Sequence, residues 1–205
     1  MGLTITTQPA AEPVSTAEAK AHMRVDTSDD DTLIGDMNTA ARELAESFQR
    51  RSYINTTWRW TLDGFPGHIP KPPGFDSQHN MRVPRSPLSS VSSIIYLTST
   101  GATATLATTV YRVDTDTEPG RISLQFGQVW PSTRQVNDAV TIAFVAGFGA
   151  TSTSVPEKMR TAVKVLCSDM YERRSSQNET SKSMRVEENK TATRLLWSGR
   201  IIEAA

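Results

Sequence analysis

Two helix-forming segments, about a hundred residues apart, constrain this fold more than any other feature. The later one, residues 154–174, has the sequence SVPEKMRTAVKVLCSDMYERR. Ser154 and Glu157 have the spacing of a capping box, and Pro156 suits a first turn because its missing N–H would have no helical partner. The apolar residues recur at steps of three and four: Met159, Ala162, Val163, Leu166, Cys167, Met170 and Tyr171. This period predicts a central helix that packs through one face.

The earlier segment, residues 28–50, is the expected partner of this helix. It begins with Ser28 followed by Asp29, Asp30 and Asp31, and the positive end of a helix dipole favours such acidic residues. It carries its own apolar stripe: Leu33, Ile34, Met37, Ala40, Ala41, Leu44 and Phe48. The small side chains at Ala40, Ala41 and Ala45 would let another helix approach closely. A second capping box, Ser15 with Glu18, predicts a short helix before it.

Between the two segments the apolar period changes from 3.6 to 2. Trp58, Trp60 and Leu62 alternate with polar residues, which predicts a strand with an apolar face. Further strands are predicted at 81–83, 91–97, 110–113, 121–126 and 139–145, with turns at 99–101 and 118–120 and a long loop at 63–80. The expected fold is therefore α+β, a small antiparallel-type helical bundle with an inserted β module and an extended C-terminal arm.

The expected domain organisation follows from these periods. We predict an extended N-terminal arm at 1–14, a helical bundle from 15–52 and 150–174, an inserted β module at 53–149, and a flexible C-terminal arm at 175–205. The arm is polar up to about residue 190 and then apolar, TATRLLWSGRII. An apolar tip on a solvated arm cannot easily complete the core of its own domain, so we expect it to bind a neighbour. Its candidate interface residues are Leu195, Leu196, Trp197, Arg200 and Ile201.

Charge allows a local basic face but argues against a protein that coats nucleic acid. Lys plus Arg and Asp plus Glu are both 22, so the net charge is zero. Two arginine pairs end the long helices, Arg50 with Arg51 and Arg173 with Arg174. They are either helix-end caps or charges at a subunit interface or DNA channel.

No motif predicts catalysis, a metal site or a cofactor. The histidines are scattered, and the single cysteine, Cys167, sits mid-helix beside the apolar stripe, where a thiol is usually a small core residue. The acidic run Asp29–Asp31 is explained by a helix start. With 37% hydrophobic residues, a mean hydropathy of −0.39 and no long apolar run, the chain is expected to be soluble, without a membrane span, and made in the cytoplasm.

Taken in order, several pieces resemble a known family. They are AEAKAHMRVDTSDDDTLIGDMNTAARELAESFQRRSYI, WRWTLDGFP, VPRSPLSSVSSIIYLTSTG, YRVDTDTEPGRISL, WP, NDAVTIAFVAGFG, VPEKMRTAVKVLCSDMYERR and, more faintly, RLLWSGR. This ordered set is similar to the head–tail connector (adaptor) proteins of tailed bacteriophages and phage-derived particles, and it covers about residues 15–174. Each piece alone is a packing or turn pattern, so the specificity lies in the order.

The resemblance implies a structural virion protein without enzymatic activity. Its expected partners are further copies of itself in a ring, usually of twelve, the portal at the capsid vertex, and a stopper or tail protein. DNA would pass through the ring channel without sequence-specific binding, and the C-terminal arm would reach a neighbouring ring.

Three alternatives stay open from the sequence. A stopper or tail-completion protein is the nearest. A carbohydrate- or surface-binding module would use Trp58, Trp60 and loop 63–80. An enzyme would need Asp29–Asp31 or Cys167 in a cleft with partners.

Overall fold

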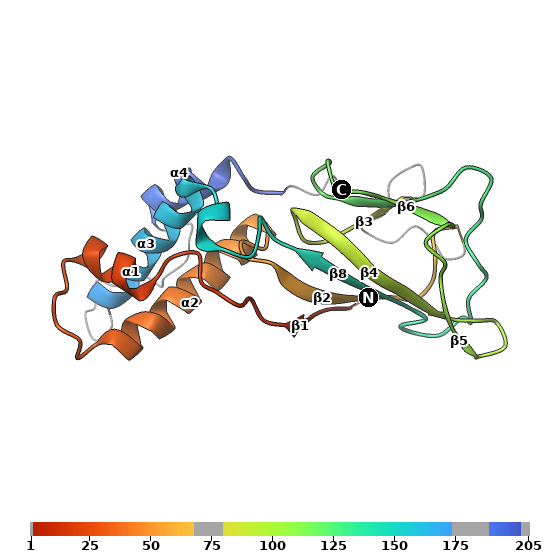
Figure 1. The fold of residues 1–205 in the computed structure, drawn as a ribbon, viewed down its shortest axis with the longest axis horizontal. Helices are drawn as coiled ribbons and strands as arrows, with labels where there is room; N and C mark the ends of the chain where they lie inside the picture. Colours follow the sequence, from red (N-terminus) through yellow and green to blue (C-terminus); the bar gives the residue numbers. More distant parts are fainter. Residues whose placement is uncertain (1, 68–79, 174–188, 202–205) are drawn as a thin grey trace. The chain divides into compact units, whose positions relative to one another are not determined.

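The computed structural model describes residues 2–67, 80–173 and 189–201, shown in Figure 1. Its chain divides into two compact units. The β unit comprises Met1–Pro9, Asn55–Phe148 and Ile201–Ala205, and the helical unit comprises Ala10–Ile54 and Gly149–Arg200. Helices and antiparallel sheets are thus segregated, which confirms the predicted α+β class.

The helical unit contains α1 (Thr16–Met23), α2 (Asp31–Gln49), the 3₁₀ turn η1 (Ser152–Ser154), α3 (Glu157–Glu172) and α4 (Lys190–Trp197). The predicted capping box at α1 is confirmed. The Ser15 hydroxyl accepts from the backbone N–H of Glu18 at 3.2 Å, and the Glu18 carboxylate accepts from the backbone N–H of Ser15 at 2.9 Å. Both bonds satisfy N–H groups that a helix start leaves unpaired.

Helices α2 and α3 pack against each other, as their stripes predicted. Tyr171, near the end of α3, donates its hydroxyl proton to the Asp30 carboxylate at 2.6 Å, just before α2 begins. Cys167 lies one turn earlier, with its sulfur 4.0 Å from the Ile34 carbonyl oxygen. The two helices therefore run antiparallel. Five residues of the predicted stripe are buried, Met159, Ala162, Val163, Leu166 and Cys167, whereas Met170 and Tyr171 are half-buried.

The capping box that we predicted from Ser154 and Glu157 does not form, and α3 begins later than predicted. Ser154 belongs to η1, and Pro156 is the N-cap residue, without a side-chain cap bond. The Glu157 carboxylate does not reach back. It accepts from Arg160 at 2.7 Å and from Lys164 at 3.3 Å. These cations hold the pKa of Glu157 below its ordinary value, chiefly through the hydrogen bond from Lys164.

The buried face of α2 also differs from the predicted stripe. Leu33 is 37% exposed, whereas polar side chains occupy the inner face. The buried residues of α2 are Ile34, Asn38, Ala41, Arg42, Ala45, Glu46 and Gln49. Asn38 donates to the Val14 carbonyl oxygen at 2.5 Å, so at least part of this polar face is hydrogen-bonded inside the unit.

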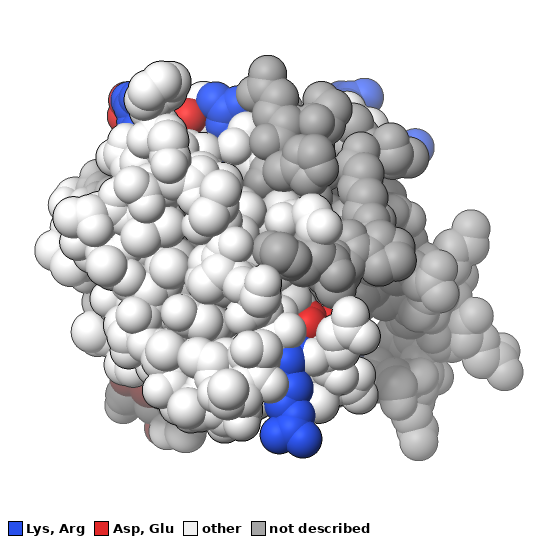
Figure 2. Space-filling model, turned by 90° about the vertical axis from the view of Figure 1, so that its right-hand side faces the viewer, with Lys and Arg blue, Asp and Glu red and all other residues white. Residues whose placement is uncertain are grey.

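The β unit contains two antiparallel sheets. The larger has the strand order β1-β2-β8-β4-β5, from β1 (Gly2–Thr7), β2 (Thr56–Leu62), β8 (Val140–Ala146), β4 (Leu88–Leu97) and β5 (Thr103–Thr105). The smaller has the order β3-β7-β6, from β3 (Met81–Arg82), β7 (Arg121–Leu124) and β6 (Tyr111–Asp114). The expected N-terminal arm thus supplies an edge strand. Figure 2 shows the face at the β5 end, where most of the visible surface of the described residues is uncharged.

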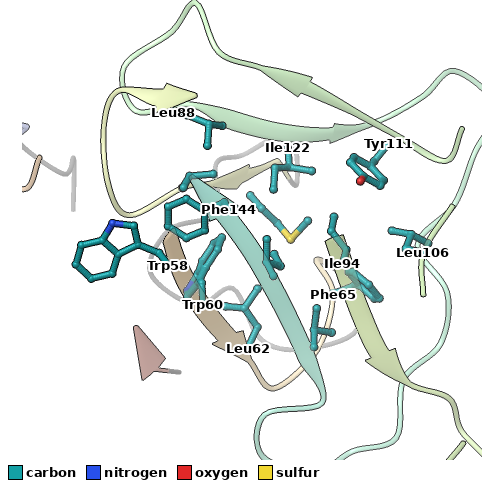
Figure 3. Packing of buried hydrophobic residues seen from close by; sticks show 14 of the residues in the cluster. Trp58, Trp60, Leu62, Phe65, Leu88, Ile94, Leu106, Tyr111, Ile122 and Phe144 are labelled. Carbon is teal, nitrogen blue, oxygen red and sulfur yellow. The ribbon is translucent and has the colours of Figure 1, made fainter. Parts of the chain in front are cut away.

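The core of the β unit lies between its two sheets. In Figure 3, Trp60 and Phe144 of the larger sheet point toward Ile122 of the smaller one. Trp58 and Trp60 are 7% and 2% exposed, so both predicted tryptophans are core residues. The alternation along β2 explains this, because every second side chain of a strand points to the same face.

Candidate interaction surface of the helical unit

The apolar C-terminal segment folds onto its own helical unit. Asn189 caps α4 by accepting from the backbone N–H of Ala192 at 3.0 Å. Ala192 and Leu196, four residues apart on one helix face, are fully buried, and α4 packs against α3 and α2. The expectation that this tip cannot complete a core of its own is therefore wrong for Leu196.

Two side chains from the end of α2 hold the end of α4. Gln49 donates its amide N–H to the Leu196 carbonyl oxygen at 2.6 Å, and Arg51 donates Nε–H to the Gly199 carbonyl oxygen at 2.5 Å. The Leu196 carbonyl also accepts from the backbone N–H of Gly199 at 3.1 Å, so the Gln49 bond adds to the hydrogen bonds that end α4, and the Arg51 bond holds the first residues after it. A Cβ atom at Gly199 would lie 2.7 Å from the Gln49 amide nitrogen, so a glycine permits this close approach.

A buried polar network orients Gln49, and the apolar pattern gave no sign of it. The Tyr53 hydroxyl donates to Gln49 Oε1 at 2.7 Å, and the backbone N–H of Tyr53 donates to Glu46 Oε1 at 2.6 Å. Burial raises the pKa of Tyr53, assisted by the Glu46 charge, so the hydroxyl stays a donor. With its oxygen engaged by Tyr53, the Gln49 amide must direct its N–H groups elsewhere.

Arg42 neutralises the buried end of this network. It donates to Glu46 at 2.9 Å and to Glu12 at 2.8 Å, and its side chain is 3% exposed. Burial works to lower the pKa of Arg42, but the charges of Glu46 and Glu12 outweigh it, so the pKa is raised. The i, i+4 spacing of Arg42 and Glu46 was the available sequence signal for this pair.

Next to these buried contacts is a partly exposed cluster, which we name the aromatic–arginine cluster: Phe48, Trp197 and Arg200. The Arg200 guanidinium carbon lies 4.7 Å from the centre of the Phe48 ring and 5.5 Å from that of Trp197. The two rings are 6.3 Å apart, and Trp197 is 57% exposed. A guanidinium over aromatic faces is held by cation–π attraction and keeps free N–H donors toward solvent.

The structure separates the predicted interface residues into different roles. Leu196 is buried, Leu195 is half-buried, and Trp197 is exposed; Arg200 and Ile201 are partly exposed. Among the predicted charges, Arg51 lies inside the unit at 6% exposure, whereas Arg50 is exposed at the end of α2.

Of the predicted arginine pairs, Arg50, Arg51 and Arg173 lie in the part of the chain that the structure describes. Arg173 ends α3, where its guanidinium lies 3.2 Å from the Asp169 carboxylate. Because α2 and α3 run antiparallel, Arg50 and Arg173 lie at opposite ends of the pair. Arg174 lies outside the described residues.

Three of the residues named for an enzyme, Cys167, Asp30 and Asp31, are engaged in the packing and hydrogen bonding of the helical unit. Cys167 is fully buried, and burial raises the pKa of its thiol to about 11, so the thiol stays protonated at neutral pH. Asp30 accepts from Tyr171, and Asp31 pairs with Lys20 at 2.5 Å. Within residues 2–67, 80–173 and 189–201 no cluster of His, Cys, Asp or Glu is arranged to hold a metal ion.

The carbohydrate- or surface-binding alternative depends on Trp58 and Trp60, and both are buried. Trp58 and Trp60 fill the core of the β unit and do not offer a ring face for a sugar to stack on. Most of loop 63–80 lies outside the described residues. None of the four described helices is long and apolar enough to span a bilayer.

Comparison with known proteins gives matches at the level of fold. No family model matches the sequence, and no curated protein does. Three solved structures match over 100% of this chain and 98% of theirs. The first is the neck of an empty GTA particle computed with C6 symmetry, with a TM-score of 0.78 and 21% identity. This chain shares its fold with a gene transfer agent subunit.

Two further solved structures give the same match. One is the virion of a native gene transfer agent (GTA) particle, with a TM-score of 0.77 and 20% identity. The other is the neck of a native GTA particle computed with C12 symmetry, with a TM-score of 0.74 and 20% identity. The match covers the residues of both units.

Proposed function

We propose that this protein is a structural subunit of the neck of a phage-like particle. More specifically, it acts as a head–tail connector in a homo-oligomeric ring of twelve that docks on the portal, extends the DNA channel and offers a platform for the stopper or tail. The observation that carries this proposal is the full-length fold match to solved particle necks, at a TM-score of up to 0.78. The role is structural, with no enzymatic step.

A ring of such subunits closes when each one joins its neighbour through two different patches related by a rotation.

The net charge of the chain agrees with a position along a DNA channel. A protein that lines a DNA path without gripping it must avoid a large excess of cations, because neutralised phosphates strengthen binding. The zero net charge meets this requirement.

We assign portal docking to the aromatic–arginine cluster. Trp and Arg are the residue types that most often dominate binding energy at protein interfaces. Trp197 follows directly on the buried Leu196, and the Gln49 and Arg51 bonds fix the backbone on both sides of it. Docking on such a fixed surface costs little conformational entropy. Leu196 supports the surface from inside, and Leu195 and Ile201 flank the exposed ring in sequence.

The test uses particles that carry Trp197→Ala with Arg200→Ala, and Arg194→Ala as the matched control. Arg194 is an exposed arginine on the same helix, outside the cluster. We expect the double variant to fold normally but to be depleted at least tenfold from purified particles, with Arg194→Ala retained. Cryo-electron microscopy of the wild type should show the ring in direct contact with the portal.

Other results would contradict the proposal in distinct ways. If the double variant is found in particles in the same amount as the wild type, the aromatic–arginine cluster does not mediate docking. A ring seen only on the tail side of another ring would favour the stopper or tail-completion alternative. Particles that lack the wild-type protein would overturn the neck assignment itself.

A further inference from the structure

The loop after β7 exposes two apolar side chains to an unusual degree. Phe126 is 104% exposed and Val129 is 79% exposed. The other exposed large apolar residues of the described β unit, Ile5, Ile95 and Val136, lie between 36% and 40%. We call Phe126 with Val129 the apolar knob. Full exposure of a phenylalanine leaves its whole ring in contact with water, which is unfavourable unless a partner covers it.

The knob stands on a fixed support. Gln128 donates its backbone N–H to the Gln125 carbonyl oxygen at 3.0 Å, which closes a turn, and Gly127 adopts a φ of 75° within it. Gln125 is itself tied to Val110 by a backbone hydrogen bond of 2.9 Å. The turn is therefore bonded both within itself and to the rest of the β unit.

On the other side of the turn the chain returns to the core. Trp130 is 6% exposed and stacks on Phe65, with ring centres 4.9 Å apart and planes inclined by 8°. This anchor directly follows the exposed Val129 in the sequence. The knob is thus presented in a set position, which lowers the ordering cost of binding.

The sequence on both sides of the knob, and the stretch that includes Val110, is uncharged. Residues 86–111 and 122–133 contain no Asp, Glu, Lys or Arg and are rich in Ser and Thr. The chain after β7 runs along the side of the β unit that Figure 2 faces, where uncharged atoms form a broad continuous area. DNA and anionic lipid surfaces are attracted mainly through Lys and Arg. An apolar centre on an uncharged face instead matches an uncharged protein surface.

We propose that the apolar knob inserts into an apolar cavity with an uncharged rim on a second structural protein of the particle. That the partner belongs to the neck rests on the proposed function. A second copy of this chain is a poorer match. The exposed apolar residues elsewhere in the described β unit are single and only partly exposed, and Trp197 of the helical unit carries the Arg200 guanidinium over its ring.

The experiment replaces Phe126 with a photo-crosslinking residue of similar shape, Phe126→p-benzoylphenylalanine, in particles that lack the wild-type gene. Irradiated particles are purified, and the crosslinked product is identified by mass spectrometry. In parallel, particles are made with Phe126→Ser plus Val129→Ser, and with Thr105→Ser on the exposed β5 strand as the matched control. The amounts of this chain and of each other particle protein are measured in all three.

We expect a crosslink from position 126 to one other particle protein. The serine double variant should still be present in the particles, while the crosslinked partner falls about thirtyfold, the effect of losing a dominant interface residue. Thr105→Ser should change neither amount. The urea midpoint of the purified double variant should equal that of the wild type, since both side chains are exposed.

The other possible results contradict either the inference about the knob or the proposed function. A crosslink only to a second copy, only to DNA, or to nothing would overturn the inference, as would normal partner content in the serine double variant. These results leave the neck assignment standing, provided that the wild-type chain is found in the particles. Its absence from wild-type particles would overturn the proposed function and, with it, the partner.

Discussion

Replacing Leu196 with alanine tests whether α4 belongs to the core of its own unit. The Leu196 side chain is fully buried against α2 and α3. A Leu→Ala change in a core removes apolar contacts and leaves a cavity, at a cost of about 2–5 kcal/mol. Alanine is an excellent helix former, so α4 should still form in this variant. The Gln49 side chain bonds to the backbone carbonyl of residue 196, so that hydrogen bond should also be kept.

The expected loss is large enough to be measured directly. With a urea dependence of about 1–3 kcal/mol per molar, a loss of about 3 kcal/mol lowers the unfolding midpoint by roughly 1–3 M. Circular dichroism at 222 nm follows the helical unit. The neighbouring Leu195→Ala is the matched control, because it makes the same chemical change at a half-buried position, and we expect it to cost less than about 1 kcal/mol.

Equal midpoints for the two variants would refute this account of α4. They would mean that Leu196 does not pack inside the isolated subunit, and the residue would then be free for the interface that the sequence suggested. A loss of stability in Leu196→Ala but not in Leu195→Ala would instead show that Leu196 packs in the core of the helical unit. Trp197 would then remain the residue of α4 that we propose to contact the portal.

Three further predictions concern buried and ionised groups. Arg42→Ala should cost about 3–5 kcal/mol in urea unfolding, because Glu46 would keep a buried charge without its main partner; a cost below 1 kcal/mol would contradict this. The pKa of Glu18 is lowered from 4.5, chiefly by the bond from the Ser15 N–H, so its stabilisation is present above that value and is lost as the pH falls through the folded pKa. The wild type should therefore be more stable than Glu18→Gln at pH 7, and the gap should close between about pH 5 and pH 3; a constant gap would refute the linkage. The Cys167 thiol should react with a disulfide reagent at pH 8 many times more slowly in native protein than in urea, since its pKa is about 11 and it is buried; equal rates would mean an accessible thiol.

The helical pair shows how far periodicity carries. The stripe of α3 was predicted because its buried face is apolar, so hydrophobic spacing and burial coincide. In α2 they do not coincide, because Asn38, Arg42, Glu46 and Gln49 face inward and Leu33 faces out. A buried polar face can be recognised only through its partners, and these come from distant parts of the chain, such as Val14 and Leu196.

The C-terminal segment shows a different limit. The polar stretch before residue 190 suggested a detached tip, although the spacing of Ala192 and Leu196 was compatible with one packed helix face. What decides the matter is the pair of bonds from Gln49 and Arg51, residues separated from their acceptors by 147 and 148 positions. No local pattern encodes such a pairing. For the same reason the exposed knob was not predicted, since apolar residues at 126 and 129 suggest a strand or a core position before the fold is known.

The two proposed contact surfaces are built on the same physical arrangement. Each places an exposed aromatic ring within a few residues of a fully or almost fully buried anchor: Trp197 beside Leu196, and Phe126 four residues before Trp130. A ring held this way has little freedom to lose on binding, so more of the energy of its burial is available for association. The anchors belong to separate cores, one in the helical unit and one in the β unit. A change at one surface therefore leaves the support of the other intact, and a subunit with this design can hold two different neighbours through two independent contacts.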